Sequence, residues 1–360
     1  MIEYENLAKL NQPWRNEFKE AFDNVLQTGW FILGEQVKQF ENTFASYINV
    51  NHCIGVASGL DALELSILAL DLEKGAEIIV PSNTYIATIL AILNTGHVPV
   101  LVEPDPYTYN INPLTIEKAL TKKTKAVLVV HLYGKTCEMD LINETCKNNK
   151  LYLIEDCAQA HGAQYKGKMA GSFGHLSAFS FYPTKNLGCL GDGGAVCTNH
   201  PQFYERVMKL RNYGSSKKYY NDLIGTNSRL DELQAAFLTI KLKYLKEITT
   251  HKRELAQIYF KHLKSDFQLP SIDKDHFDVF HIFIILHEKR DQLKDYLLEQ
   301  GIKTEIHYPV PPHKQKAMIG FAKKEYPISE RIHQQCLSLP ISTIHSHDEI
   351  YKVAEVMNKF

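Results

Sequence analysis

Seven short apolar segments between residues 53 and 198 limit the folds that this chain can adopt. They are Cys53–Ala57, Glu77–Pro81, Val98–Val102, Ala126–Leu132, Leu151–Asp156, Ser177–Phe181 and Ala195–Thr198. Most are continuous runs of Val, Ile and Leu, which is typical of strands that are covered on both faces. Helical patterns lie between several of them, such as Leu60, Leu63 and Ile67 between the first two. This alternation predicts a doubly wound α/β domain with a mostly parallel, seven-stranded sheet.

The remainder of the chain predicts a second, smaller unit, because 360 residues are too many for one compact core. The expected elements are helices at Pro201–Leu210 and at Arg229–Ile248 continuing through Tyr259, a strand at Val279–Leu286, and helices at Arg290–Gln300 and Asp348–Asn358. We therefore predict a large domain over residues 1–250, which includes an N-terminal arm. A small C-terminal α+β domain is predicted over residues 251–360.

Composition argues against several kinds of partner. The formal net charge of −1 gives no general reason to expect nucleic acid or an anionic membrane. No apolar run approaches the ~20 residues of a membrane span, and the first residues lack the basic and apolar regions of a secretory signal. The seven cysteines are odd in number and never spaced as Cys-x-x-Cys. This favours free thiols in a cytoplasmic protein and no metal site.

One lysine and one aspartate carry the functional prediction. Asp156 ends an apolar strand, and an acid there is costly to bury unless it meets a cation. The protonated ring nitrogen of pyridoxal 5′-phosphate (PLP) is such a cation. Lys185 has mostly apolar or glycine neighbours, which favours the desolvated amine that a Schiff base with PLP requires. Both groups are needed by a PLP enzyme, whereas a solvated loop lysine is the alternative interpretation.

Further residues suit the other groups of this cofactor. The strand-to-helix turn at Gly59 offers backbone amides to a phosphate, and Ser180 adds a hydroxyl. Tyr85 follows a strand and is placed to cover the ring, while Gln159 is placed to bond the ring hydroxyl. Each signal is weak alone, because such turns are common and an aromatic residue after a strand usually belongs to the core.

Five longer motifs resemble those of the sugar-nucleotide aminotransferases, the DegT/DnrJ/EryC1/StrS family. They begin at Gly34, Gly55, Glu155, Ser180 and Asn227, and they read GEQV, GVASGLDAL, EDCAQAHG, SFYPTKNLG and NSRLDELQAA. Phe40 and Glu41 belong to the first of them. The resemblance runs in the family's order from about residue 28 to about residue 315. It implies the aspartate aminotransferase type of fold, which is fold type I of PLP enzymes. It also implies a homodimer whose active sites borrow residues from the neighbouring subunit.

The resemblance assigns roles to single residues. The lysine that matches Lys185 forms the Schiff base, and the aspartate that matches Asp156 pairs with the ring nitrogen. With the residues above, the expected cofactor-binding positions are Gly59, Leu60, Tyr85, Asp156, Gln159, Ser180, Lys185 and Asn227. Asn227 is expected to reach the phosphate from the partner subunit. Many members have Thr where this chain has Leu60, so only a backbone amide is available at this position.

Two segments narrow the range of expected substrates. Residues 211–221 and 305–313 resemble the branch that aminates C3 of a dTDP-linked 3-keto-6-deoxyhexose, with L-glutamate as the family's usual donor. The expected substrate-binding residues are Tyr182, Lys217, Lys218, Tyr219, His307 and Tyr308. A lysine pair among tyrosines suits a diphosphate, although a solvated basic loop is the alternative. The product would serve surface polysaccharide synthesis, such as that of lipopolysaccharide O-antigen.

Other reactions remain as alternatives. The nearest is the same chemistry at C4 of a UDP-, GDP- or dTDP-linked 4-keto-6-deoxyhexose. A related PLP dehydratase would have histidine at position 185. An NAD-dependent oxidoreductase would need Gly-x-Gly-x-x-Gly after the first strand, and the sequence has no such turn. A PLP-binding regulator would usually carry a basic DNA-binding segment, which the chain does not show.

Overall fold

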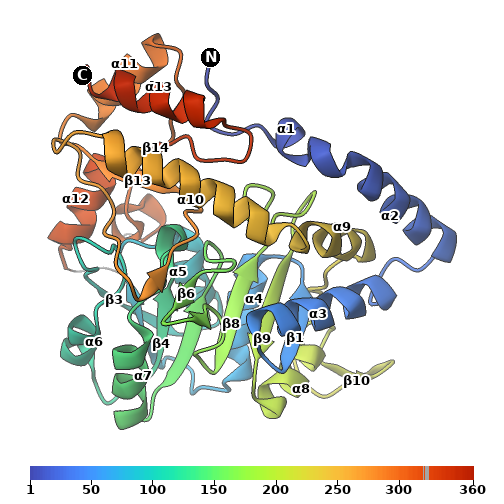
Figure 1. The fold of residues 1–360 in the computed structure, drawn as a ribbon. Coiled ribbons are helices and arrows are strands. Elements are labelled where there is room, and N and C mark those ends of the chain that lie inside the picture. Colours follow the sequence, from blue (N-terminus) through green and yellow to red (C-terminus); the bar gives the residue numbers. More distant parts are fainter. Residues whose placement is uncertain (319, 321–323) are drawn as a thin grey trace.

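A seven-stranded sheet forms the centre of the computed structural model, which describes residues 1–318, 320 and 324–360 (Figure 1). Its strands are β1 (His52–Val56), β2 (Glu77–Pro81), β3 (Val98–Val102), β4 (Thr124–Val130), β5 (Tyr152–Asp156), β8 (Leu176–Ser180) and β9 (Gly194–Thr198). The order is β1-β9-β8-β5-β4-β2-β3. β9 runs antiparallel to both of its neighbours, whereas the other pairs are parallel. The predicted sheet is therefore confirmed.

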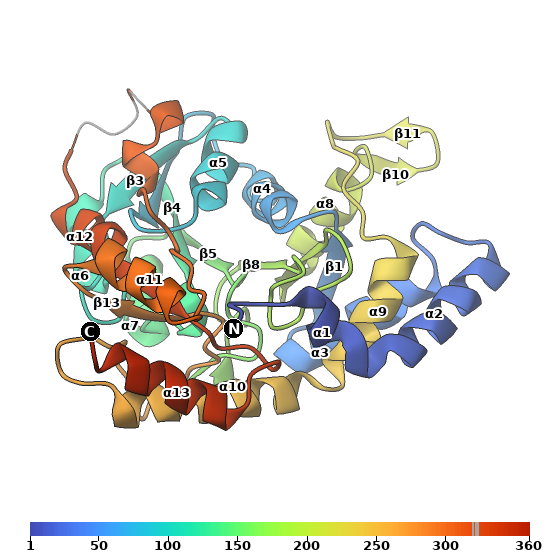
Figure 2. The same ribbon diagram turned by 90° about the horizontal axis from the view of Figure 1, so that it is seen from above.

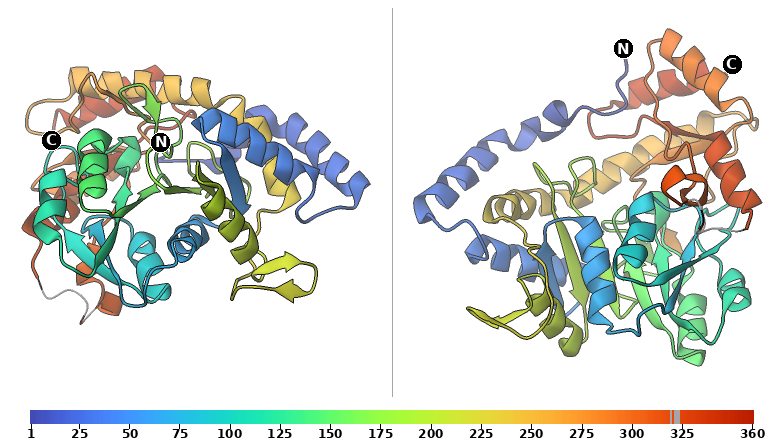
Figure 3. Two further views of the ribbon diagram at one scale, coloured as in Figure 1. Left: turned by 90° about the horizontal axis from the view of Figure 1, so that it is seen from below. Right: turned by 180° about the vertical axis from the view of Figure 1, so that it is seen from behind.

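Helices cover both faces of this sheet because its strands are apolar on both sides. In β4, Ala126, Leu128 and Val130 pack on one face, and Val127 and Val129 pack on the other. The first face is covered by α4 (Gly59–Ala69), α5 (Ile86–Asn94) and α8 (Pro201–Leu210). The second is covered by α3 (Glu35–Ile48), α6 (Pro113–Ala119), α7 (Met139–Asn148) and α9 (Glu232–Leu242) (Figure 3). This is the predicted doubly wound architecture.

The N-terminal residues form an arm along one side of the molecule. The arm consists of α1 (Leu7–Asn11), a 3₁₀ turn η1 (Gln12–Trp14) and α2 (Arg15–Thr28). In Figure 1 it reaches away from the C-terminal elements towards the end of α9. Trp14 and Phe18 hold it there by packing on Phe237 and Ile240 of α9.

The single helix predicted from Arg229 through Tyr259 is wrong, because the chain turns between two helices. α9 ends at Leu242, and α10 (Leu245–His262) begins after two intervening residues. One of them is Tyr244, whose ring lies 5.8 Å from that of Trp14 in the arm. α10 then leads into the C-terminal elements, and the division at residue 250, which falls within α10, stays a prediction.

The C-terminal elements after α10 are β12 (His276–Phe277), β13 (Phe283–Leu286), α11 (Arg290–Glu299), η3 (Pro312–Lys314), η4 (Lys316–Met318), α12 (Pro327–Gln335), β14 (Cys336–Leu339) and α13 (His347–Met357) (Figure 2). Residues of β13, α11, β14 and α13 form an apolar cluster with α10, whereas Met318 of η4 and Ile332 of α12 join the cluster on the first face of the large sheet. β13 pairs with β14, and β12 pairs with the small hairpin of β6 (Gln164–Tyr165) and β7 (Lys168–Met169).

The strand predicted over Val279–Leu286 starts only at Phe283. The residues before it bond instead to the 3₁₀ turn η2 (Leu132–Gly134), which follows β4. The amide of Val279 donates to the carbonyl oxygen of Gly134 at 2.9 Å, and the amide of Ile282 donates to that of Tyr133 at 3.4 Å. This segment therefore closes over the edge of the large sheet rather than extending the small one.

Candidate active site

A cavity of about 500 Å³ lies where the parallel strands of the sheet have their carboxyl ends. Ligands bind at this edge in open α/β sheets. The predicted site residues that line it are Gly59, Leu60, Tyr85, Asp156, Gln159, Ser180, Tyr182, Lys185, His307 and Tyr308. The first eight end or follow β1, β2, β5 and β8, and the last two come from the segment between β13 and β14. The structure thus brings residues from both halves of the chain to one cavity.

Lys185 lies in a tight turn after β8. Its amide donates to the carbonyl oxygen of Tyr182 at 2.8 Å. The glycine at 188 is required because a Cβ there would lie 2.4 Å from the carbonyl oxygen of Pro183. Burial lowers the pKa of Lys185 to about 8, although Asp156 acts in the opposite direction. The amine is therefore closer to its neutral, nucleophilic form than an ordinary lysine at neutral pH.

Asp156, the last residue of β5, is held by two hydrogen bonds. The amide of Ala158 donates to Oδ1 at 3.1 Å, and the hydroxyl of Thr88 on α5 donates to Oδ2 at 2.9 Å. Burial raises the pKa of Asp156, although both donors and Lys185 act in the opposite direction. A cation beside this carboxylate would offset the cost of its burial. Among the described residues, Asp156 forms no salt bridge.

The start of α4 forms a cradle beside β8 that could hold an anion. Ser58 caps the helix by accepting the amide of Asp61 at 3.1 Å, and Gly59 and Leu60 are its first two residues. Amides at the start of a helix have no partner within the helix and attract anions. A Cβ on Gly59 would lie 2.5 Å from Cβ of Ser180, so only glycine fits here. Ser180 thus lies directly beside the two amides.

Gln159 and two tyrosines form the wall opposite the cradle. The side-chain oxygen of Gln159 accepts the amide of Tyr133 at 2.7 Å, and its nitrogen donates to the hydroxyl of Tyr308 at 3.0 Å. One amide hydrogen of Gln159 is left for a ligand. The ring of Tyr85 lies 5.0 Å from that of Tyr308. Tyr85 is half exposed at the cavity and is not part of the core.

His307 comes from the segment between β13 and β14. Its Nδ1 is 2.9 Å from the hydroxyl of Ser338 on β14. Burial, reinforced by the nearby Lys185, lowers the pKa of His307 to about 4. The imidazole is therefore neutral at pH 7 and offers a hydrogen bond rather than a charge to the cavity.

Four predicted site residues do not line this cavity within one chain. Asn227 is exposed, and Lys217, Lys218 and Tyr219 lie in the hairpin of β10 (Ser215–Lys217) and β11 (Tyr220–Asn221). In Figure 2 this hairpin extends outwards from α8, away from the C-terminal elements. The Lys217 and Lys218 amines lie 5.8 Å and 5.2 Å from the ring centres of Tyr220 and Tyr219.

Three residues of the cavity region were missed from the sequence. Thr88 is one helical turn beyond Thr84, and the two hydroxyls are 2.7 Å apart. The two threonines, spaced by four residues after the end of β2, could have indicated that Thr88 faces the cavity. His281 lines the cavity from the irregular segment before β13, and Tyr133 supports Gln159 from η2. His281 falls within the strand predicted over Val279–Leu286, and no sequence pattern singles out Tyr133.

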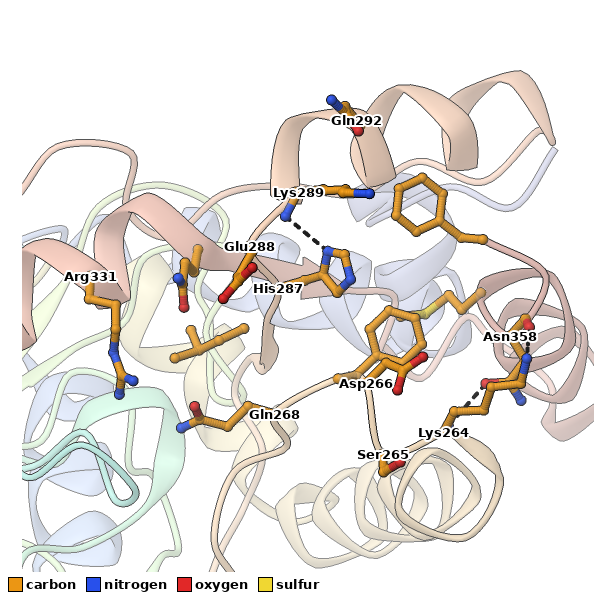
Figure 4. Close-up of a pocket in the computed structure, with 15 residues that line it drawn as sticks. Lys264, Ser265, Asp266, Gln268, His287, Glu288, Lys289, Gln292, Arg331 and Asn358 are labelled. Carbon is orange, nitrogen blue, oxygen red and sulfur yellow. Dashed lines mark hydrogen bonds between the residues drawn. The ribbon is translucent and has the colours of Figure 1, made fainter.

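A larger cavity lies elsewhere, among the C-terminal elements, and has a volume of about 870 Å³. Figure 4 shows Lys264 and Asp266 on one side of it and Glu288, Lys289 and Arg331 on the other. Its charges are mixed, and none of the predicted site residues lines it. We therefore place the candidate active site at the smaller cavity.

Two groups of side chains in the described ranges lie close enough to share a metal ion. In the buried group, His131, Glu155 and Cys157, the carboxylate already accepts three backbone amides and pairs with His131 at 2.9 Å. The other group, His251, Glu254 and His347, lies nearer the surface of α10 and α13. The expectation of no metal stays a prediction. All seven cysteines are buried and free, as expected.

The fold and the cavity together define an aminotransferase of fold type I. The model of the DegT/DnrJ/EryC1/StrS aminotransferase family matches residues 13–358, and the chain belongs to this family. It is therefore a sugar aminotransferase, and the prediction of an enzyme is confirmed. In the part of the chain that the structure describes, no helix has the length and apolar character needed to cross a bilayer.

Similar proteins support the same class along the whole chain. The dTDP-3-amino-3,6-dideoxy-α-D-galactopyranose transaminase of Aneurinibacillus thermoaerophilus is 53% identical over 100% of this chain and 99% of its own length. The solved structure of Streptomyces venezuelae DesV in complex with a ketimine intermediate has a TM-score of 0.96 and 43% identity, covering 98% of this chain and 96% of DesV. Bacillus subtilis NtdA with bound cofactor PMP has a TM-score of 0.91 and 30% identity, covering 99% and 84%.

Proposed function

We propose that this enzyme uses PLP to transfer an amino group from L-glutamate to C3 of a dTDP-linked 3-keto-6-deoxyhexose. The observation that supports this most is the meeting of Lys185, Asp156 and the free amides at the start of α4 in one cavity. The similarity to the A. thermoaerophilus transaminase supports the dTDP nucleotide and amination at C3.

The cavity residues suit PLP group by group. The amides of Gly59 and Leu60 and the hydroxyl of Ser180 would hold the phosphate. Asp156, buried without a salt bridge partner among the described residues, would pair with the protonated ring nitrogen. The bound cofactor supplies an electron sink that stabilises a carbanion at the reacting carbon.

Lys185 would first hold the cofactor aldehyde and then act as the general base and acid. Its Nζ would take the proton from the α-carbon of glutamate and later deliver a proton to C3 of the sugar. A pKa of about 8 suits both tasks, since the ideal catalytic pKa lies near the working pH. The hydrogen bonds from Thr88 and Ala158 keep the Asp156 carboxylate oriented while this proton moves.

The sugar would lie against Tyr182, His307 and Tyr308 at the open side of the cavity. Tyr182 is half exposed, and the neutral His307 can bond a hydroxyl without attracting a proton from it. The diphosphate would meet Lys217 and Lys218 together with the ring of Tyr219. These three residues would come from a partner subunit, since they do not line the cavity of their own chain.

A homodimer therefore forms part of the proposal. Its interface would include the apolar surface at the end of α2 and just beyond it, where Leu26, Trp30 and Phe31 are each more than half exposed. A surface of this kind at one place marks a contact with another protein. Trp30 and Phe31 precede Gly34, whose amide donates to Glu232. Leu230, two residues before Glu232, lies beside Gly55 of β1, the strand that leads to the cradle. The interface would thus lie near the two sites that it completes.

The test is an amination assay with purified protein, PLP and glutamate, in which dTDP-linked 3-keto and 4-keto 6-deoxyhexoses are compared. Mass spectrometry should show a 3-amino product and 2-oxoglutarate, with little product from the 4-keto sugar. Preference for a 4-keto sugar, or for a UDP- or GDP-linked one, would favour the alternative substrate. No product from any keto sugar would refute the proposal.

A further inference from the structure

A second, much smaller cavity also reaches Lys185. It has a volume of about 20 Å³, which is room for about one water molecule. Two other lysines line it, Lys241 of α9 and Lys252 of α10, together with Glu5 from the N-terminal segment. Lys185 therefore has two buried lysines as close neighbours.

Lys252 is bonded to both segments that shape the active site around Lys185. Its Nζ donates to Oδ1 of Asn186 at 2.9 Å and to the carbonyl oxygen of His281 at 3.1 Å. Asn186 immediately follows Lys185, and its side-chain nitrogen Nδ2 donates to the carbonyl oxygen of Val279 at 3.1 Å. One ammonium group thus joins the turn that carries Lys185 to the segment that brings His281 into the cavity.

The buried ammonium group of Lys252 joins these two segments at a cost in the stability of the folded protein. Lys252 is 5% exposed, and among the described residues it forms no salt bridge. A buried cation without a paired carboxylate costs stability, and an apolar side chain would avoid that cost. The group is therefore better explained by its effect on Lys185 than by stability.

We propose that Lys252 is a positioning residue for Lys185, which fixes the turn through Asn186 and places a positive charge beside the reactive amine. This inference rests on the proposed function, because it assumes that Lys185 is the amine that binds PLP. The charge should make protonation of Lys185 less favourable, since like charges in a buried site repel.

Several other titratable groups face Lys185. Asp156 favours its protonated form, and three histidines, His161, His281 and His307, have pKa values lowered by burial first and by Lys185 second. Glu5 and Lys241 line the small cavity. Burial lowers the pKa of Lys252 to about 8, although Glu5 acts in the opposite direction. Most of Lys252 is therefore protonated at pH 7 and can exert this repulsion.

The test measures the rate at which the apoenzyme captures PLP, as a function of pH, in Lys252→Met, Lys252→Gln and Lys252→Arg. Lys246→Met is the matched control, because Lys246 is an exposed lysine of the same helix. In Lys252→Met the pH of half-maximal capture should move upwards, since a neighbouring positive charge is lost. Lys252→Gln, which keeps a donor without the charge, should show the same shift if the methionine variant does not fold.

The arginine variant separates charge and positioning from packing. Lys252→Arg should keep the wild-type pH profile, and Lys246→Met should be unchanged. The turnover number of Lys252→Met should fall by about 100-fold, as expected when a reacting group is misplaced by about 1 Å.

An unchanged capture profile in both neutral variants would overturn the inference. The same shift in Lys252→Arg would also overturn it, because the effect would then lie in packing. Failure of the wild-type apoenzyme to capture PLP at any pH would instead refute the proposed function itself.

Discussion

Replacing Thr88 with valine tests whether the hydrogen bond from Thr88 stabilises the ionised form of the buried Asp156 carboxylate. The Thr88 hydroxyl donates to Oδ2 of Asp156 at 2.9 Å, and both residues are buried. Valine keeps the shape of threonine and removes the donor. A hydrogen bond to a charged group contributes about 1.5–3 kcal/mol, and one to a neutral group about 0.5–1.5 kcal/mol. Thr88→Val should therefore lower the unfolding free energy of the apoenzyme more when Asp156 is ionised than when it is protonated.

The direction of the pH effect follows from the pKa of Asp156. Burial raises this pKa in the folded protein, so the folded state binds the proton more tightly than the unfolded chain. The contribution of Asp156 to stability is then most favourable below the unfolded pKa, and it falls as the pH rises through the folded pKa. Thr88→Val raises the folded pKa further. The loss of unfolding free energy in the variant should thus be larger at about pH 8 than at about pH 4.

Urea unfolding of the apoenzyme at the two pH values measures this difference. Thr95→Val is the matched control, because Thr95 ends the same helix and its hydroxyl bonds only to backbone carbonyl oxygens of α5. The turnover number of the PLP-loaded Thr88 variant should also fall, by up to roughly 100-fold for 3 kcal/mol. An equal loss at both pH values, or an equal pH dependence in Thr95→Val, would show that Asp156 is not held in this way.

Three further variants test the cradle, the hairpin and the fold. Gly59→Ala should lower the affinity for PLP, measured by equilibrium dialysis, because its Cβ would lie 2.5 Å from that of Ser180; unchanged affinity would place the phosphate elsewhere. The double variant Lys217→Ala and Lys218→Ala should raise KM for the nucleotide sugar and leave PLP affinity unchanged. An unchanged KM would remove the hairpin from the substrate site. Glu232→Ala should lower the unfolding free energy by about 1–3 kcal/mol, because Glu232 accepts the amides of Gly34, Gln36 and Val37 at 2.8–2.9 Å at the start of α3. Normal stability in urea would contradict this role.

Much of the fold was predictable because the strands are short, apolar and covered on both faces. Asp156 ends its strand as predicted, and Ser180 ends its strand one residue before the predicted end at Phe181, so their meeting at one edge followed from a parallel sheet. The break between α9 and α10 was not predictable, because helical periodicity continues across Lys243 and Tyr244. It depends on packing with Trp14, which is far away in the sequence.

The motifs contain residues that line the cavity and residues that stabilise the fold, and the sequence alone does not distinguish the two groups. Lys185 and Gln159 face the cavity, whereas Glu232 caps α3 and Glu41 bonds Arg211 and the amide of Gly55. The contributions of Thr88 and Lys252 depend on contacts across 68 and 66 residues, respectively. No local pattern marks such contacts.

The central claim is most directly tested by finding which lysine binds PLP. The enzyme would be reduced with borohydride after PLP loading, digested, and its peptides mapped by mass spectrometry. Lys241 and Lys252 serve as internal controls, because burial lowers their pKa values to about 8, as it does for Lys185. We predict the reduced cofactor on Lys185 and on neither of the other two. An unlabelled Lys185, or label on Lys241 or Lys252, would contradict the account.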